Sequence, residues 1–224
     1  MDRVRVFSMA SLGFLLSLSL PAAAQPLTFT NVGAPAINCV FSKPVGKLCS
    51  VVVNDSVGAI PLPAGVAGKG ILQTRTFAGA AGTPGAGKTA YEYRIDMTQA
   101  VSDGEIPCVT DLAVNFGPDT KLPYKGNATL YDVYVITSGG IGSVSLFDVE
   151  RTGNVVDFIF NQPVCAGPMP GSGLSSYFFG IASASPPHAV TAHVGWPGLD
   201  PLAVAARAPG AKGPKSPIRP LRPH

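Results

Sequence analysis

The fold is decided between CVTDLAVNF, residues 108–116, and VVDFIFNQPVC, residues 155–165. In both segments apolar side chains stand at every second position, so that Phe158 and Phe160, for example, share one face. Successive side chains of a strand point to opposite faces of a sheet, so this alternation predicts two half-buried β-strands. Two more β-rich runs, residues 129–137 and 142–149, lie between them. We expect the four to form a β-meander.

Outward from this stretch the same pattern recurs in short runs separated by turns. The 26 glycines and 22 prolines favour turns and disfavour long helices. Asn54–Lys69 is predicted as a loop because Pro61 and Pro63 interrupt regular structure. The chain is therefore expected to be all-β, a two-sheet antiparallel β-sandwich of about nine or ten strands, immunoglobulin-like or jelly-roll-like, with a closed barrel as the alternative. Further strands are predicted at residues 27–31, 50–53, 70–77, 91–97, 176–182 and 188–194.

The first residues are typical of a secretory signal peptide, not of a folded domain. Arg3 and Arg5 precede an apolar run, and small residues follow up to Ala24, where cleavage is expected. The run is short of the roughly 20 residues that span a bilayer, and no later stretch could span one as a helix. We therefore divide the chain into a signal peptide, 1–24, a β-sandwich domain, 25–194, and a Pro-rich, basic, disordered C-terminal tail, 195–224. The predicted location is periplasmic or extracellular.

Four cysteines in an exported chain predict two disulfides. Three pairings are possible. Cys39 with Cys49 and Cys108 with Cys165 is favoured, because the first bond closes a short hairpin-like loop and the second joins the ends of the meander. Close spacing of the Cys-x-x-Cys kind is missing, so no metal site is predicted.

One motif matches a phosphate-binding loop letter for letter. GTPGAGKT, residues 82–89, fits the Walker A pattern with Gly82, Gly87, Lys88 and Thr89. Such a loop opens a helix, whereas the residues that follow, 91–97, alternate as a strand does. We interpret the match as a chance one within a loop between two strands, and expect no nucleotide or other cofactor.

The remaining polar residues suggest little chemistry. Glu92 and Asp96 lie four residues apart, on one strand face with Arg94 between them, which indicates exposed solubilising charge more than a glycosidase pair. Asp119, Asn127 and Asp132 supply oxygen ligands, but without the dense spacing of a calcium loop.

Residues 188–224 add two histidines, a lone tryptophan and the basic tail. His188 and His193 fall on opposite faces of a strand, so shared metal binding is not expected. Trp196, the only tryptophan, is expected either to hold the tail onto the domain or to offer its ring to a sugar.

No catalytic residues are predicted, because no nucleophile signature accompanies the few histidines. The formal net charge is only +3, so nucleic acid is not an expected partner. The leading hypothesis is an exported, non-catalytic module for envelope or extracellular binding or structure, with a polysaccharide or a protein as its unidentified partner. An adhesin- or pilin-like assembly subunit and a secreted hydrolase are the alternatives.

Overall fold

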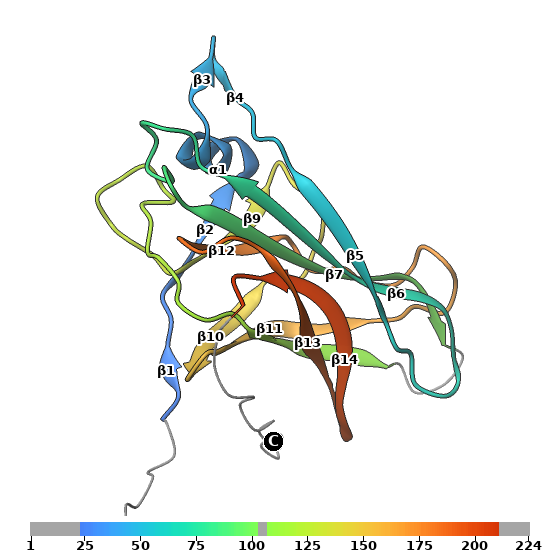
Figure 1. Ribbon diagram of the computed structural model, residues 1–224. Coiled ribbons are helices and arrows are strands. Elements are labelled where there is room, and N and C mark those ends of the chain that lie inside the picture. Colours follow the sequence, from blue (N-terminus) through green and yellow to red (C-terminus); the bar gives the residue numbers. More distant parts are fainter. Residues whose placement is uncertain (1–22, 103–106, 211–224) are drawn as a thin grey trace, which may run out of the picture.

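The computed structural model describes residues 23–102 and 107–210, and two packed β-sheets make up nearly all of it (Figure 1). One sheet, called sheet A here, has the order β1-β10-β11-β8-β13-β14, and the other, sheet B, has the order β2-β9-β12-β7-β6-β5. The predicted β-sandwich is therefore the fold. Residues 1–22, which are nearly all of the predicted signal peptide, and residues 211–224, the last part of the predicted tail, lie outside the described residues.

Sheet A is antiparallel throughout. Phe158 and its alternating neighbours point from it into the space between the sheets, as the sequence predicts. Its strands are β1 (Gln25–Pro26), β8 (Cys108–Asn115), β10 (Leu146–Thr152), β11 (Val155–Cys165), β13 (His188–Trp196) and β14 (Leu199–Ala208).

Sheet B is mixed, because β2 runs parallel to β9 while the other neighbours are antiparallel. Its inner face carries Tyr91, Tyr93, Ile95 and Met97, all fully buried as expected. Its strands are β2 (Phe29–Gly33), β5 (Asn54–Ile60), β6 (Val66–Ala78), β7 (Thr89–Ser102), β9 (Val133–Ser138) and β12 (Phe179–Ser183).

The predicted meander is wrong, because β9 does not lie between β8 and β10. It pairs with β2 and β12 in sheet B, while β8 pairs directly with β11 in sheet A. The long segment from Phe116 to Asp132 carries the chain from one sheet to the other, which period-two alternation alone cannot reveal. Cys108 and Cys165 are direct cross-strand partners at the end of the β8–β11 ladder, and their disulfide joins neighbouring strands of one sheet.

Two local predictions near β5 are also wrong. The β-branched residues 51–53 form no strand, since this segment only connects the hairpin to sheet B. The predicted loop Asn54–Lys69 instead contains β5 and the start of β6. Position 58 in β5 requires a glycine, because an added Cβ would lie 2.2 Å from the carbonyl oxygen of Ala205. That glycine lets β14 pack against β5 where the two sheets meet.

The C-terminal boundary predicted at residue 195 is too early. β13 continues to Trp196, and Leu199–Ala208 pairs with it as β14 from His188 onward. Small alternating residues such as Val204 and Ala206 are buried in the core. An Ala-rich strand has a weak apolar pattern, and with its proline and arginine this one resembles a disordered tail.

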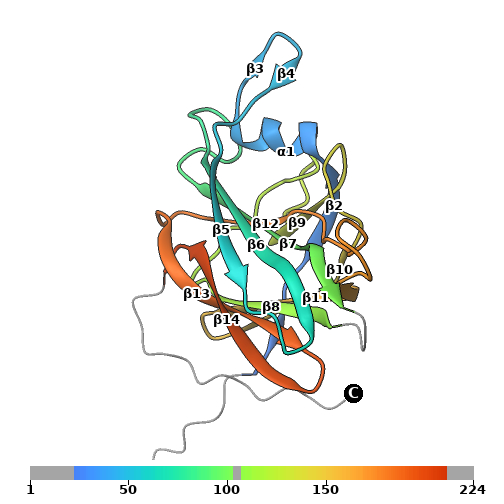
Figure 2. The ribbon, with the colours of Figure 1, turned by 90° about the vertical axis from the view of Figure 1, so that its right-hand side faces the viewer.

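A short helix and a hairpin cap one end of sheet B; the hairpin agrees with the hairpin-like loop expected between Cys39 and Cys49, whereas the helix was not predicted. α1 (Ala34–Phe41) covers the outer face of the sheet with Ile37, Val40 and Phe41. The hairpin of β3 (Pro44–Val45) and β4 (Leu48–Cys49) projects away from the body above it (Figures 1 and 2).

Candidate functional site

The hairpin that projects from α1 presents two of the three most exposed large apolar side chains of the described residues. Val45 is 85% exposed and Leu48 is 74% exposed. Gly46 turns the chain between them with a φ of 66°, a value that a glycine adopts without strain. Lys47 at the turn is exposed as well. A water-facing apolar tip with a cation beside it is suited to contact with another surface.

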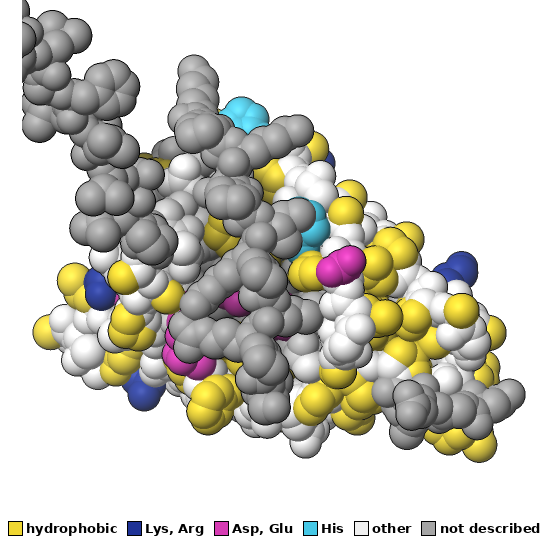
Figure 3. Space-filling model, turned by 90° about the horizontal axis from the view of Figure 1, so that it is seen from below, with side chains coloured by type: hydrophobic (Ala, Val, Ile, Leu, Met, Phe, Trp, Pro, Cys, Tyr) yellow, Lys and Arg dark blue, Asp and Glu magenta, His cyan; other side chains and the backbone are white. Residues whose placement is uncertain are grey.

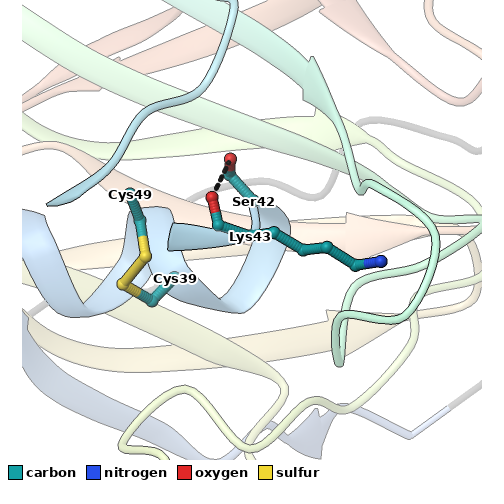
Figure 4. Close-up of a disulfide and its surroundings, with 4 residues drawn as sticks. All are labelled: Cys39, Ser42, Lys43 and Cys49. Atoms are coloured by element: carbon teal, nitrogen blue, oxygen red, sulfur yellow. Dashed lines mark hydrogen bonds between the residues drawn. A yellow bond between two sulfur atoms is a disulfide. The ribbon is translucent and has the colours of Figure 1, made fainter. Parts of the chain in front are cut away.

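A disulfide fixes this hairpin to the helix below it. Cys39 lies in α1 and Cys49 ends β4, and their sulfur atoms are bonded (Figure 4). This is the pairing that the spacing favours. Between the two cysteines, Ser42 ends the helix and its hydroxyl donates to the carbonyl of Lys43. The base of the hairpin is thereby held in one direction relative to sheet B. Together the two disulfides point to a non-cytoplasmic location.

The Walker-like segment, Gly82–Thr89, is a turn between β6 and β7, and a strand follows it, not a helix. Several of its backbone donors are already used. The N–H groups of Thr83, Gly85 and Lys88 donate to the carbonyls of Ala80, Val40 and Gly85, respectively. A phosphate-binding loop needs such N–H groups free to face the anion. The packing of Gly85 on the ring of Phe41 gives this glycine a structural role, since a Cβ would lie 2.5 Å from the ring.

Glu92 and Arg94 do not form the exposed charged face that the sequence predicts. Their exposed fractions are only 3% and 8%, because Tyr134 lies against Glu92 and the guanidinium of Arg94 lies 5.9 Å from the centre of the Phe178 ring. The hydroxyl of Tyr134 donates to Oε1 of Glu92 over 3.0 Å. Tyr134 reaches across β12 only because Gly180 has no side chain, as a Cβ there would lie 2.3 Å from the ring.

This row of polar groups continues to the edge of sheet B. Arg75 lies beside Glu92 on the next strand and pairs with Asp55 on β5 over 3.0 Å. Burial raises the pKa of Glu92 to about 7, although the bond from Tyr134 and the charge of Arg75 act in the opposite direction. The guanidinium of Arg75 also stacks over Phe178, 4.0 Å from the ring centre. Each charge of the row has a partner, which indicates that the row stabilises the sheet.

The structure brings Asp119 and Asp132 together, but with cations in place of a metal ion. Arg151 donates to Asp119 over 2.8 Å, and Lys121 lies 3.1 Å from Asp132. Asp132 also accepts bonds from the N–H and hydroxyl of Thr28, each 2.7 Å long. Burial raises the pKa of Asp119. Burial alone would also raise the pKa of Asp132, but Thr28 and Lys121 lower it.

No calcium site is supported by this arrangement. Over residues 23–102 and 107–210 no group of three or more acidic, histidine or cysteine side chains is placed to hold a metal ion. Asn127 does not join the two aspartates, since its side chain accepts from the N–H of Thr129 within its own loop. Asp132 binds Thr28, just before β2 of sheet B, and Asp119 pairs with Arg151 of sheet A. The sequence alone cannot indicate this role, because the partners lie far apart along the chain.

Trp196 is 1% exposed, so its ring is not available for stacking on a sugar. It belongs to the main core and pairs with Leu199 of β14, which agrees with the alternative expectation that it holds the C-terminal segment. His188 and His193 both lie on β13, and their odd spacing of five residues places them on opposite faces of the strand.

The end of the sandwich opposite the hairpin is hollowed only slightly. An open depression of about 540 Å³ is lined by six residues, Ala67, Gly68, Lys69, Gln99, Val101 and Pro170. It has a single charged side chain and borders residues that the structure does not describe. Within the described parts of the chain, no helix is long and apolar enough to cross a membrane.

Comparison with protein-family models, with curated protein sequences and with solved structures finds no match for this chain. Function therefore has to be argued from the geometry above.

Proposed function

We propose that this chain is an exported, non-catalytic β-sandwich module that binds a component of the cell envelope or of the extracellular surroundings. The observation that carries the proposal is the β3–β4 hairpin. It is held by the Cys39–Cys49 disulfide, it projects from the body, and it exposes Val45 and Leu48 to water. Large apolar side chains that are exposed on a projection lower the solubility of a protein, and such exposed patches usually mark a surface that contacts a partner.

Two features support export to the periplasm or beyond the cell. Both disulfides require an oxidising compartment to persist. The first strand, β1, begins at Gln25, immediately after the cleavage site expected at Ala24. A domain that starts where the signal peptide ends is the arrangement that processing would leave.

The chemistry of the charged groups supports a binding role over a catalytic one. Asp119 and Asp132 are each held by a cation, and Glu92 is bonded to Tyr134 beneath the surface of sheet B. Carboxylates in these settings position strands.

The test is to purify the disulfide-bonded domain from residue 25 onward and to measure its binding to isolated envelopes and extracellular polymers. We expect saturable binding, with no turnover in a panel of glycoside, ester and peptide substrates. Hydrolysis of any panel substrate that the pure protein sustains would replace this proposal with the hydrolase alternative.

An assembly subunit is the second candidate, and the edge of sheet A favours it. β1 pairs with β10 only at Glu150 and Arg151, so the preceding residues of β10 extend beyond the two-residue strand β1. Phe147 in that stretch is 71% exposed. Open strand edges can accept a strand from another chain. Light scattering over a range of concentrations tests this: a monomer throughout argues against it, and an oligomer that Phe147→Asp dissociates would establish it.

A further inference from the structure

Three segments that are far apart in sequence form the hairpin end of the molecule. They are residues 34–53, with α1 and the hairpin, residues 79–90, the Walker-like turn, and residues 138–143, the turn after β9. The N–H of Ala80 donates to Phe41, and a Cβ on Gly139 would lie 3.5 Å from the ring of Pro35. We call this set the hairpin end (Figures 1 and 2).

Uncovered apolar side chains gather at the hairpin end. Besides Val45 and Leu48 at the tip, Val52 is 93% exposed and Ile141 is 53% exposed. They come from two of the three segments, so the apolar character belongs to the end of the molecule and not to one loop. The hairpin makes this surface convex.

The charge of the hairpin end has one sign. Its three segments contain Lys43, Lys47 and Lys88 and not a single aspartate or glutamate. The ammonium of Lys43 lies over Gly82, where a Cβ would be 3.1 Å from its Nζ, so two segments share this charge. Among the described residues none of the three lysines forms a salt bridge with a carboxylate. From the opposite side of the molecule, both acidic and basic side chains are visible (Figure 3).

We propose that the hairpin end docks onto an anionic lipid surface, with Val45 and Leu48 entering the headgroup region and the lysines facing lipid phosphates. This inference rests on the proposed function and names its partner. Apolar side chains flanked by unpaired cations match such a surface in both polarity and charge. A folded protein partner fits less well, because a stable interface takes about 20–30 residues a side, whereas the strongly exposed apolar side chains of the hairpin end are only a few, Val45, Leu48, Val52 and Ile141.

The residues of the Walker-like motif have structural roles at the hairpin end. The glycines of the motif allow the turn to pack on α1, and Lys88 contributes to the positive charge of the hairpin end. No nucleotide is needed to account for either.

The experiment is flotation of the disulfide-bonded domain with vesicles of phosphatidylcholine alone or mixed with phosphatidylglycerol. We expect binding that requires phosphatidylglycerol and weakens as salt is added. Val45→Ser combined with Leu48→Ser should reduce the partition coefficient at least about tenfold, and Lys47→Gln about fivefold. Matched controls are Met169→Ser and Lys69→Gln, which remove an exposed apolar group and a cation from outside the hairpin end and should leave binding unchanged.

A second measurement reports insertion itself. Trp196 is buried, so its fluorescence is a constant background. In Leu48→Trp the new fluorescence should shift to the blue on adding anionic vesicles and be quenched by lipids brominated on their chains.

The outcomes separate this inference from the proposed function. Absence of vesicle binding by the wild-type domain, or binding that the serine variant retains, would overturn the lipid inference. Hairpin-dependent binding to lipid-free envelope polymer would also overturn it, while leaving the proposed function intact. If neither the binding to lipid nor the binding to polymer depended on the hairpin, the lipid inference and the proposed function would both be overturned.

Discussion

Glu92 is a carboxyl group whose protonation should govern the stability of sheet B. Burial raises the pKa of Glu92 from an ordinary value of 4.5 to about 7, so the folded protein keeps the proton over a range in which the unfolded chain releases it. The stabilisation is therefore complete below pH 4.5 and is lost as the pH rises through 7. The shift corresponds to about 3 kcal/mol.

We expect the free energy of unfolding to fall by that order between about pH 5 and about pH 8. Urea titrations at several pH values measure it. Glu92→Gln is the control, because an amide keeps the size of the side chain but cannot ionise; its stability should be flatter over the same range. Equal slopes in the two proteins would show that Glu92 is already ionised in the fold.

Phe158 is the residue whose loss the core should tolerate least well. It is fully buried and its ring lies 4.9 Å from that of Phe179 and 5.9 Å from that of Tyr93, so it joins the two sheets. Phe158→Ala should cost about 3–5 kcal/mol, through lost burial and a cavity. Phe147→Ala on the neighbouring strand removes a ring that is 71% exposed, and should change stability by at most about 0.5 kcal/mol. Chemical unfolding of both variants gives the comparison; similar losses would place Phe158 outside the core.

At the scale of elements, the turn Gly82–Thr89 tests whether a sequence motif or its setting determines chemistry. The N–H groups of Thr83, Gly85 and Lys88 are bonded to backbone carbonyls, and a strand follows the turn. Lys88→Ala should therefore leave the stability of the domain unchanged, and calorimetry should detect no binding of ATP with magnesium to either protein. Micromolar ATP binding that the variant loses would contradict the assignment of this turn as a hairpin connection.

Elements with strong alternation are those that the sequence predicts well. The runs around Tyr93, Leu112 and Phe158 are strands with the expected inward faces, because each places large apolar side chains at every second position. Strand order is different, since β9 joins sheet B through contacts with β2 and β12 that no local pattern encodes.

The candidate site was harder to predict from the sequence than the core. The cysteine spacing indicates a hairpin-like loop, but the proline and the glycine beside Val45 and Leu48 give no sign that these two side chains are exposed. The sequence predicts an exposed Glu92, because the side chain bonded to it, Tyr134, lies 42 residues further along the chain. The absence of acids near Lys43 and Lys47 was the signal available in the sequence.

For the whole molecule, β14 decides where the domain ends. Val204, Ala206 and Ala208 are buried, and the carbonyl of Arg207 accepts a bond from the hydroxyl of Tyr93. Truncation after Gly198 should therefore cost a large share of the roughly 5–15 kcal/mol that stabilises a typical domain. Truncation after Gly210 is the matched control, since it removes no described contact. Thermal unfolding compares the two, and equal melting temperatures would restore the domain boundary near residue 195.

The two ends of the molecule differ. β5 and β14 pack together where the two sheets meet, and a hairpin with exposed apolar and cationic side chains projects from one end. The central claim is that this end is the binding surface. The most direct measurement is the affinity of the disulfide-bonded domain for isolated envelopes, compared between wild type, Val45→Ser with Leu48→Ser, and Met169→Ser. We predict that the hairpin variant binds at least about tenfold more weakly while the Met169 variant equals wild type. Equal binding by all three proteins would contradict the account.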